Sequence, residues 1–182
     1  SHSYPIDGVA TTNADSYLTP LGSIPIDQKT IATLSVPYLQ IFEEPFNSEH
    51  SLEVQLPFLQ VTLKEFSLIP LLAGYTTPIQ VATILEKLWD GPETLIVVSS
   101  DLSHYHPYKV AQNQDHNTAQ AILSLDPDRI NPEDACGSIG IKGLLKIAIN
   151  RKMSVTQIDL CNSGDTAGPK DSVVGYGAFH FK

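Results

Sequence analysis

Apolar and amphipathic segments alternate along most of the chain. Short apolar runs rich in β-branched or aromatic residues predict strands, over residues 36–42, 67–73, 94–100, 154–160 and 172–181. Apolar positions at helical spacing predict amphipathic helices, over residues 28–34, 49–63, 78–88, 108–124 and 137–150. Alternating strands and helices are typical of an α/β fold. We therefore predict a three-layer αβα domain around a largely parallel or mixed central sheet.

Local signals mark where some of these helices begin or bend. Asp27 and Thr77 are predicted N-caps, because their side-chain oxygens can accept a hydrogen bond from the first helical turn. Pro57 falls inside the apolar pattern of residues 49–63 and predicts a kink there. The helix over residues 78–88 is expected to bury Ile79 together with the apolar positions that follow it.

The segment over residues 94–106 changes character abruptly. It opens with the pattern of a strand buried on both faces of a sheet and then presents Ser, Asp and His side chains. Ligands of open α/β sheets bind beyond the carboxyl ends of the strands. Asp101 and His104 are therefore predicted to form the floor of a site. The alternative is a polar loop whose Asp and Ser residues cap the next helix.

Composition narrows the class of protein. The chain has 182 residues, of which 42% are hydrophobic, and a formal net charge of −9. Its length suits a single domain over residues 1–182, and its charge argues against nucleic acid or an anionic membrane as a partner. No apolar run reaches the roughly 20 residues of a membrane helix. Cys136 and Cys161 do not make a secreted disulfide framework, so we expect a cytoplasmic protein with free thiols.

Cys136 is the first candidate for chemistry, because it directly precedes a predicted helix. The free N–H groups and the dipole of a helix N-terminus favour a thiolate, which is a metal ligand or a nucleophile. The alternative is a buried, inert cysteine, which is our interpretation of Cys161. Glu49 and His50 begin another predicted helix and either line a cleft or are simply solvated. Because no dense ligand motif is present, spacing alone identifies neither a metal nor a reaction.

Five groups of residues, taken in order, point to one family. They are Thr19–Gly22 with Asp27, Glu49–Phe58, Ser99–Tyr105, Ala135–Gly137, and Asn162–Asp165 with Val173–Tyr176. Over nearly its whole length the chain thereby resembles the Memo-like proteins, whose prokaryotic members are often called AmmeMemoRadiSam system protein B. This resemblance implies the fold of class III extradiol dioxygenases, which cleave catechol rings with non-haem iron.

The resemblance also implies metal ligands. The family's site contains two histidines and a cysteine, of which the second histidine matches His2 and the cysteine matches Cys136. The first histidine belongs to an upstream Pro-His-Ala-Gly segment that this chain does not contain. The chain also begins at Ser1 rather than at Met. We therefore expect a domain that lacks its N-terminal strand segment.

Further residues take their roles from the same resemblance. Asp101 and His104 match the polar pair beside the metal, with His104 in the place of the dioxygenases' acid/base histidine. Glu49 and His50 are assigned to the same cleft. A thiolate is softer than the carboxylate ligand of ring-cleaving enzymes and favours copper, zinc or a redox role. We expect iron or copper in the full-length protein and little or no metal in this chain, since two ligands rarely hold one well.

Three functions remain open from the sequence. The first is a metal-dependent, dioxygenase-like redox enzyme for an unknown small molecule, with His104 moving a proton. The second is a non-catalytic module that binds a peptide or a protein in the same cleft. The third is thiol chemistry, with Cys136 as the nucleophile and His104 or His50 as the base. The resemblance adds a functional link to AMMECR1-type and radical SAM proteins.

Overall fold

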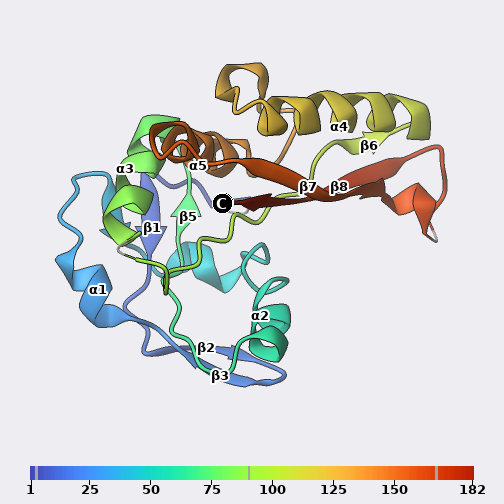
Figure 1. The fold of residues 1–182 in the computed structure, drawn as a ribbon. Coiled ribbons are helices and arrows are strands. Elements are labelled where there is room, and N and C mark those ends of the chain that lie inside the picture. The colour runs from blue at the N-terminus through green and yellow to red at the C-terminus, as the bar shows by residue number, and fades with distance from the viewer. Residues whose placement is uncertain (3, 90, 167) are drawn as a thin grey trace. The chain divides into compact units, whose positions relative to one another are not determined.

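The chain folds into a mixed α/β protein, seen in a computed structural model that describes residues 1–2, 4–89, 91–166 and 168–182 (Figure 1). It forms two compact units, Ser1–Ser99 and Ser100–Lys182. The mixture of helices and strands confirms the predicted α/β class, and the three-layer arrangement stays a prediction. The expectation of a single domain over residues 1–182 stays a prediction.

Two small sheets form the strand framework of the first unit. One has the order β4-β1-β5, with β1 parallel to β4 and antiparallel to β5. The other is the hairpin of β2 and β3. The strands are β1 (Val9–Thr11), β2 (Ser16–Thr19), β3 (Gly22–Pro25), β4 (Leu39–Ile41) and β5 (Leu72–Ala73). The helices are α1 (Gln28–Thr33), the 3-10 helix η1 (Glu44–Asn47), α2 (Leu56–Thr62) and α3 (Pro78–Leu88).

The predicted caps of the first unit are confirmed. The Thr30 N–H donates to Asp27 Oδ1 over 3.0 Å at the start of α1. At the start of α3, the Gln80 N–H donates to Thr77 Oγ1, and the Thr77 N–H donates to Gln80 Oε1. This reciprocal pair is a capping box, which satisfies two backbone donors that a helix start leaves free.

Two expectations about these helices are wrong. Pro57 does not kink a longer helix, because α2 begins at Leu56 and Pro57 lies in its first turn. Proline suits that turn, since its missing N–H would have no helical partner there and its φ is already helical. Ile79 is 65% exposed. The buried face of α3 begins two residues later, with the helical spacing of Val81, Ile84, Leu85 and Leu88.

The strand predicted over residues 94–100 is also wrong. Within the described part of the chain this segment carries neither helix nor strand. Its apolar side chains are not buried on both faces, because Leu95 is 65% exposed and Val97 is 46% exposed. β-branched residues suit an extended backbone, but a strand exists only where a neighbour supplies its hydrogen bonds. The polar residues after this segment therefore do not extend from a strand end.

The second unit packs helices against an antiparallel sheet of order β6-β8-β7. Its strands are β6 (His104–His106), β7 (Val155–Asn162) and β8 (Val173–Phe181). Its helices are α4 (Tyr108–Leu123), η2 (Pro127–Arg129), α5 (Ser138–Asn150) and η3 (Ser163–Asp165). The predicted helices 108–124 and 137–150 and strands 154–160 and 172–181 are thus confirmed. Helix α4 contacts all three strands, and a core cluster is buried in this unit around Ala121, Ile122, Ile130 and Leu145.

Parallel pairing does not dominate among the described strands. Only the β1–β4 pair is parallel, whereas the pairs β1–β5, β2–β3, β6–β8 and β7–β8 are antiparallel. The prediction of a sheet that mixes parallel and antiparallel strands is therefore confirmed for the sheet β4-β1-β5. The described residues between β7 and β8 form the 3-10 helix η3 and turns but no α-helix, and such a short connection favours antiparallel neighbours. In the described ranges, no helix combines the length and the apolar character needed to cross a bilayer.

Candidate functional site

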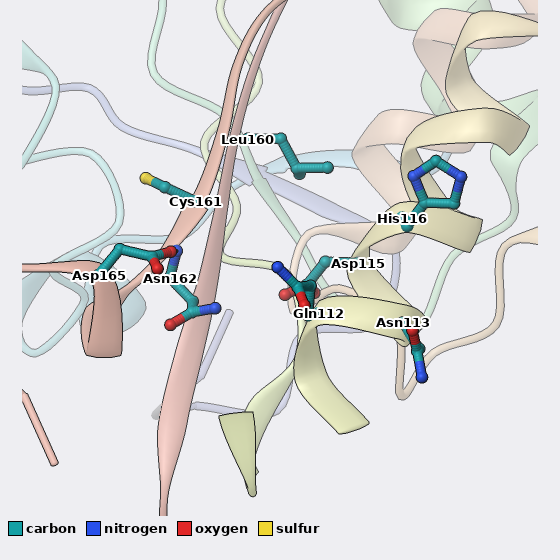
Figure 2. A pocket seen from close by; sticks show the side chains of 8 residues that line it. All are labelled: Gln112, Asn113, Asp115, His116, Leu160, Cys161, Asn162 and Asp165. Atoms are coloured by element: carbon teal, nitrogen blue, oxygen red, sulfur yellow. The ribbon is translucent and has the colours of Figure 1, made fainter. Parts of the chain in front are cut away.

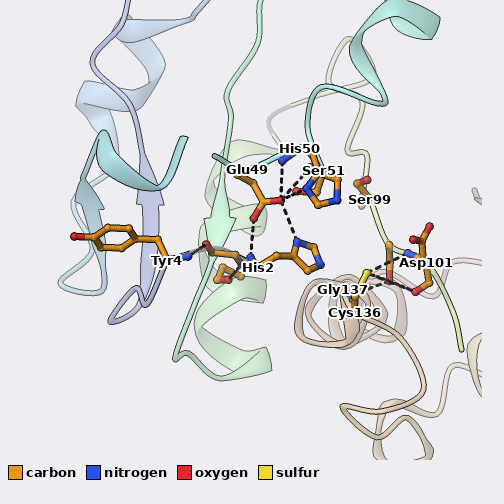
Figure 3. Close-up of polar contacts among 12 residues, drawn as sticks. His2, Tyr4, Glu49, His50, Ser51, Ser99, Asp101, Cys136 and Gly137 are labelled. Atoms are coloured by element: carbon orange, nitrogen blue, oxygen red, sulfur yellow. Dashed lines mark hydrogen bonds and ion pairs between the residues drawn. The ribbon is translucent and has the colours of Figure 1, made fainter. Parts of the chain in front are cut away.

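A buried carboxylate organises the polar group of the first unit. Glu49 follows η1 and is only 2% exposed. It accepts four hydrogen bonds, shown in part in Figure 3. The backbone N–H groups of His2, His50 and Ser51 donate over 2.7, 3.0 and 3.0 Å, and His2 Nδ1 lies 3.0 Å from Glu49 Oε1. This carboxylate therefore ties the loop after η1 to the segment that begins the chain.

The charge of Glu49 decides how the His2 ring is used. Burial raises the pKa of Glu49, but the hydrogen bonds from His2 and Ser51 outweigh it and lower the pKa to about 2. An ionised carboxylate only accepts hydrogen bonds, so His2 Nδ1 must carry the proton. In the neutral imidazole, Nε2 then keeps its lone pair. A carboxylate that fixes the tautomer of a metal-binding histidine in this way is a recurring feature of metal sites.

His50 completes this group. Its ring centroid lies 5.4 Å from that of His2, and its Nδ1 lies 3.8 Å from Glu49 Oε1. Potential ligand atoms of His2, Glu49 and His50 all lie within 4.8 Å of one another. The two imidazoles remain available to a ligand, with side chains 40% and 69% exposed. Because Glu49 is buried and already accepts four hydrogen bonds, it suits a supporting role for His2 better than a ligand role.

Cys136 lies in the second unit, directly before the N-cap of α5. Its side chain is exposed, so the alternative of a buried, inert cysteine is wrong for this residue. The Asp101 N–H donates to its sulfur over 3.2 Å, and the Ser100 hydroxyl lies 3.7 Å from the sulfur. Ser100 Oγ also accepts the Gly137 N–H over 2.8 Å. The sulfur is thus placed by a backbone N–H at the surface, where it could bind a metal or attack an electrophile.

Asp101 and His104 form the second polar pair of this unit. His104 Nε2 lies 3.8 Å from Asp101 Oδ2, and both side chains are partly exposed. Tyr105 follows with φ of +58°, a left-handed conformation that is costly for a bulky residue. A bulge between His104 and His106 accompanies it. Such local strain is frequent at functional sites, and here it lies directly beside His104.

The structure thus brings the predicted residues together in two groups. His2, Glu49 and His50 form one group in the first unit. Asp101 contacts both Cys136 and His104 in the second. Ligation of one metal by residues from both groups stays a prediction.

Asp115 is a site residue that no pattern in the sequence indicates. This residue of α4 is 2% exposed and accepts the Ser103 N–H over 2.9 Å. It also lines a polar hollow of about 300 Å³ between α4 and the end of β7 (Figure 2). The other residues that line the hollow are Gln112, Asn113, His116, Leu160, Cys161, Asn162 and Asp165. A carboxylate in mid-helix has no local signature, because its burial depends on strands far away in the sequence.

Comparisons with known proteins agree on one family. The sequence model described as Memo-like protein matches residues 1–180. A MEMO1 family protein of Methanosarcina barkeri is 33% identical over 183 residues, which cover 92% of this chain and 68% of that protein. A MEMO1 family protein of Ignicoccus hospitalis is 30% identical over 179 residues, which cover 90% of this chain and 62% of that protein. The chain therefore spans roughly two thirds of the length of these relatives.

Proposed function

Because the chain belongs to the Memo-like protein family, we propose that it is the larger part of a metal-dependent redox enzyme acting on an unknown small molecule. The observation that carries this proposal is the His2–Glu49 contact. An ionised, buried carboxylate holds Nδ1–H and leaves Nε2 for a metal. The finer assignment, a dioxygenase-like activity, is part of the proposal.

We assign His2 and Cys136 as metal ligands. An imidazole and a thiolate together suit iron, copper or zinc, and we propose iron or copper. When bound, such a metal supplies electron transfer or activation of oxygen. Glu49 orients the imidazole, and the Asp101 N–H donates to the Cys136 sulfur and holds it in place.

The acid/base step is assigned to His104. An imidazole can take up or release a proton near neutral pH. Asp101, whose Oδ2 lies 3.8 Å from His104 Nε2, is assigned to orient the ring. His104 is 34% exposed at its side chain, so that a substrate can reach it. His50 lines the approach to His2.

Thiol chemistry is the second candidate. The exposed Cys136 side chain, whose sulfur accepts the Asp101 N–H and lies 3.7 Å from the Ser100 hydroxyl, supports a nucleophile as well as a ligand. The two functions differ in their need for metal. A non-catalytic peptide-binding module would need neither the metal nor the thiol.

The wider setting is proposed as well. We propose a three-layer αβα arrangement like that of class III extradiol dioxygenases, within a single domain. Two cysteines that are free in the structure fit a reducing compartment, and we propose the cytoplasm. The family resemblance supports a functional link to AMMECR1-type and radical SAM proteins.

A metal-binding experiment tests the proposal. Full-length protein, wild type and variants, is loaded with Fe(II) without oxygen or with Cu(II), freed of excess ion, and analysed for metal content. We expect His2→Ala and Cys136→Ser each to lose most of the metal, and Glu49→Gln to bind it about 10- to 100-fold more weakly. His180→Ala, which removes an exposed histidine of β8, is the matched control and keeps it.

The outcomes separate the candidates. Metal retained by both ligand variants, as in the control, would overturn the assignment. A loaded wild-type protein should consume oxygen with at least one member of a panel of catechols, and His104→Ala should abolish that uptake while keeping the metal. Activity toward electrophiles that requires Cys136 but no metal would favour the thiol function instead.

A further inference from the structure

Asp115 lies in the middle of α4, where a polar residue would ordinarily be solvated, yet it is only 2% exposed. Asn113 and His116 are exposed on the same helix, whereas Asp115 lies on the side nearer β7 in Figure 2. A buried carboxylate is costly unless hydrogen bonds or charges compensate it. Its contacts must therefore explain why it is buried.

The defined contact of Asp115 is with backbone. Its Oδ1 accepts the Ser103 N–H over 2.9 Å, and Ser103 is itself fully buried. Among the described residues, neither Asp115 Oδ2 nor the Ser103 hydroxyl has a hydrogen-bond partner. Burial raises the pKa of Asp115, although the N–H and the nearby hydroxyl of Ser103, and the imidazoles of His106 and His104, lower it. The Asp115 carboxyl group is thus buried at a cost in free energy, and its defined hydrogen bond is with the Ser103 amide.

Gly175 of β8 holds the same segment from another direction. The Leu102 N–H donates to Gly175 O over 2.9 Å, and the Gly175 N–H donates to Ser103 O over 2.8 Å. A Cβ atom on residue 175 would overlap the Asp115 carboxylate. Only glycine lets the strand and the carboxylate approach each other this closely. Residues 102 and 103 are therefore fixed by β8 and by α4 at once.

This fixed segment joins Asp101 to His104. Because only two residues separate them, the backbone at 102 and 103 determines where both side chains point. It also places the Asp101 N–H that donates to Cys136 Sγ. We propose that Asp115 is a positioning residue, whose hydrogen bond to the Ser103 N–H fixes the backbone between Asp101 and His104 and so sets the geometry of that pair. A role of Asp115 in catalysis rests on the proposed function, whereas its role in positioning Asp101 and His104 does not.

Three variants of the full chain test this role. Asp115→Asn keeps an oxygen that can accept the Ser103 N–H. Asp115→Ser is too short to reach that N–H and leaves room for water. Thr118→Val is the matched control, because Thr118 is equally buried in α4 and its hydroxyl donates within the helix to Gln114 O.

The readouts are the imidazole NMR signals of His104 and the hydrogen exchange of the Ser103 amide, with the exposed His180 as the internal reference. We expect Asp115→Ser to shift the His104 signals and to speed exchange at Ser103 by about fivefold or more, as loss of one buried hydrogen bond implies. Asp115→Asn should restore wild-type values for both. Thr118→Val should leave both unchanged, whatever its effect on stability.

Two results would overturn the proposal. One is that Asp115→Ser leaves the His104 signals and the Ser103 exchange rate as they are in Thr118→Val. The other is that Asp115→Asn perturbs them as much as Asp115→Ser, since charge rather than the hydrogen bond would then matter. These measurements need neither metal nor substrate. If wild-type protein binds no metal and consumes no oxygen, the proposed function fails, and the result for Asp115 still stands or falls separately.

Discussion

Replacing Glu49 with glutamine should change the pH dependence of the first unit's stability. Glu49→Gln keeps the shape of the side chain but cannot ionise. In the wild type, the pKa of Glu49 is lowered from 4.5 to about 2, which corresponds to up to about 3 kcal/mol of stability. Because the folded-state pKa is depressed, this contribution is fully present above about pH 5 and is lost as the pH falls toward 2.

The assay is urea unfolding followed by the fluorescence of Trp89, the single tryptophan of the sequence, which is the C-cap of α3 in the first unit. The free energy of unfolding is measured between pH 7 and pH 2 for the wild type and for Glu49→Gln. We expect the free energy of unfolding of the wild type to exceed that of Glu49→Gln by the largest amount above about pH 5. That margin should shrink by up to about 3 kcal/mol on acidification, since other groups titrate alike in both proteins.

Glu53→Gln provides the matched control, because Glu53 is an exposed carboxylate near Glu49 in the sequence. Its difference from the wild type should change little over the same range. A Glu49→Gln difference that is independent of pH would refute the reasoning. The carboxylate would then not be held ionised by the His2 and Ser51 donors, and the inferred His2 tautomer would lose its basis.

Three further predictions use other parts of the chain. At pH 7.5, iodoacetamide should alkylate Cys136 at least about tenfold faster than Cys161, because Cys136 is exposed whereas burial raises the pKa of Cys161; equal rates by peptide mass spectrometry would contradict this. Thr77→Ala should lower the unfolding free energy of the first unit by about 1 kcal/mol, measured by the same urea titration, and no loss would argue against the capping box. Gly175→Ala should destabilise the second unit by about 1–3 kcal/mol in thermal unfolding followed by circular dichroism, because its Cβ would overlap Asp115, and an unchanged midpoint would refute that close approach.

Local signals in the sequence predicted local structure well. The caps at Asp27 and Thr77 depend only on residues within one turn, and both are confirmed. Helices α4 and α5 and strands β7 and β8 were also predicted, because their patterns are long enough to be unambiguous. The position of Cys136 before α5 follows from the same kind of signal.

Features that depend on distant partners were not predictable in this way. Residues 94–100 have a strand's composition, yet composition does not say whether a neighbouring strand is present. The sequence suggested that Glu49 lines a cleft or is solvated, whereas burial and four donors from two segments set its actual state. Asp115 gave no signal, because its burial requires Gly175, sixty residues further along the chain.

In both polar groups, single side chains accept hydrogen bonds from the backbone of nearby loops and so fix the conformation of those loops. Glu49 accepts backbone N–H groups from residues 2, 50 and 51, Asp115 accepts the N–H of Ser103, and Cys136 Sγ accepts the N–H of Asp101. Each of these three side chains thus accepts hydrogen bonds from the backbone of a loop, and an N–H that loses its acceptor is costly where it is buried. Removing such an acceptor frees the loop backbone as well as the side chain, so the neighbouring imidazoles move with it. Substitutions at these acceptors should therefore disturb His2 and His104 more than substitutions of the exposed residues beside them.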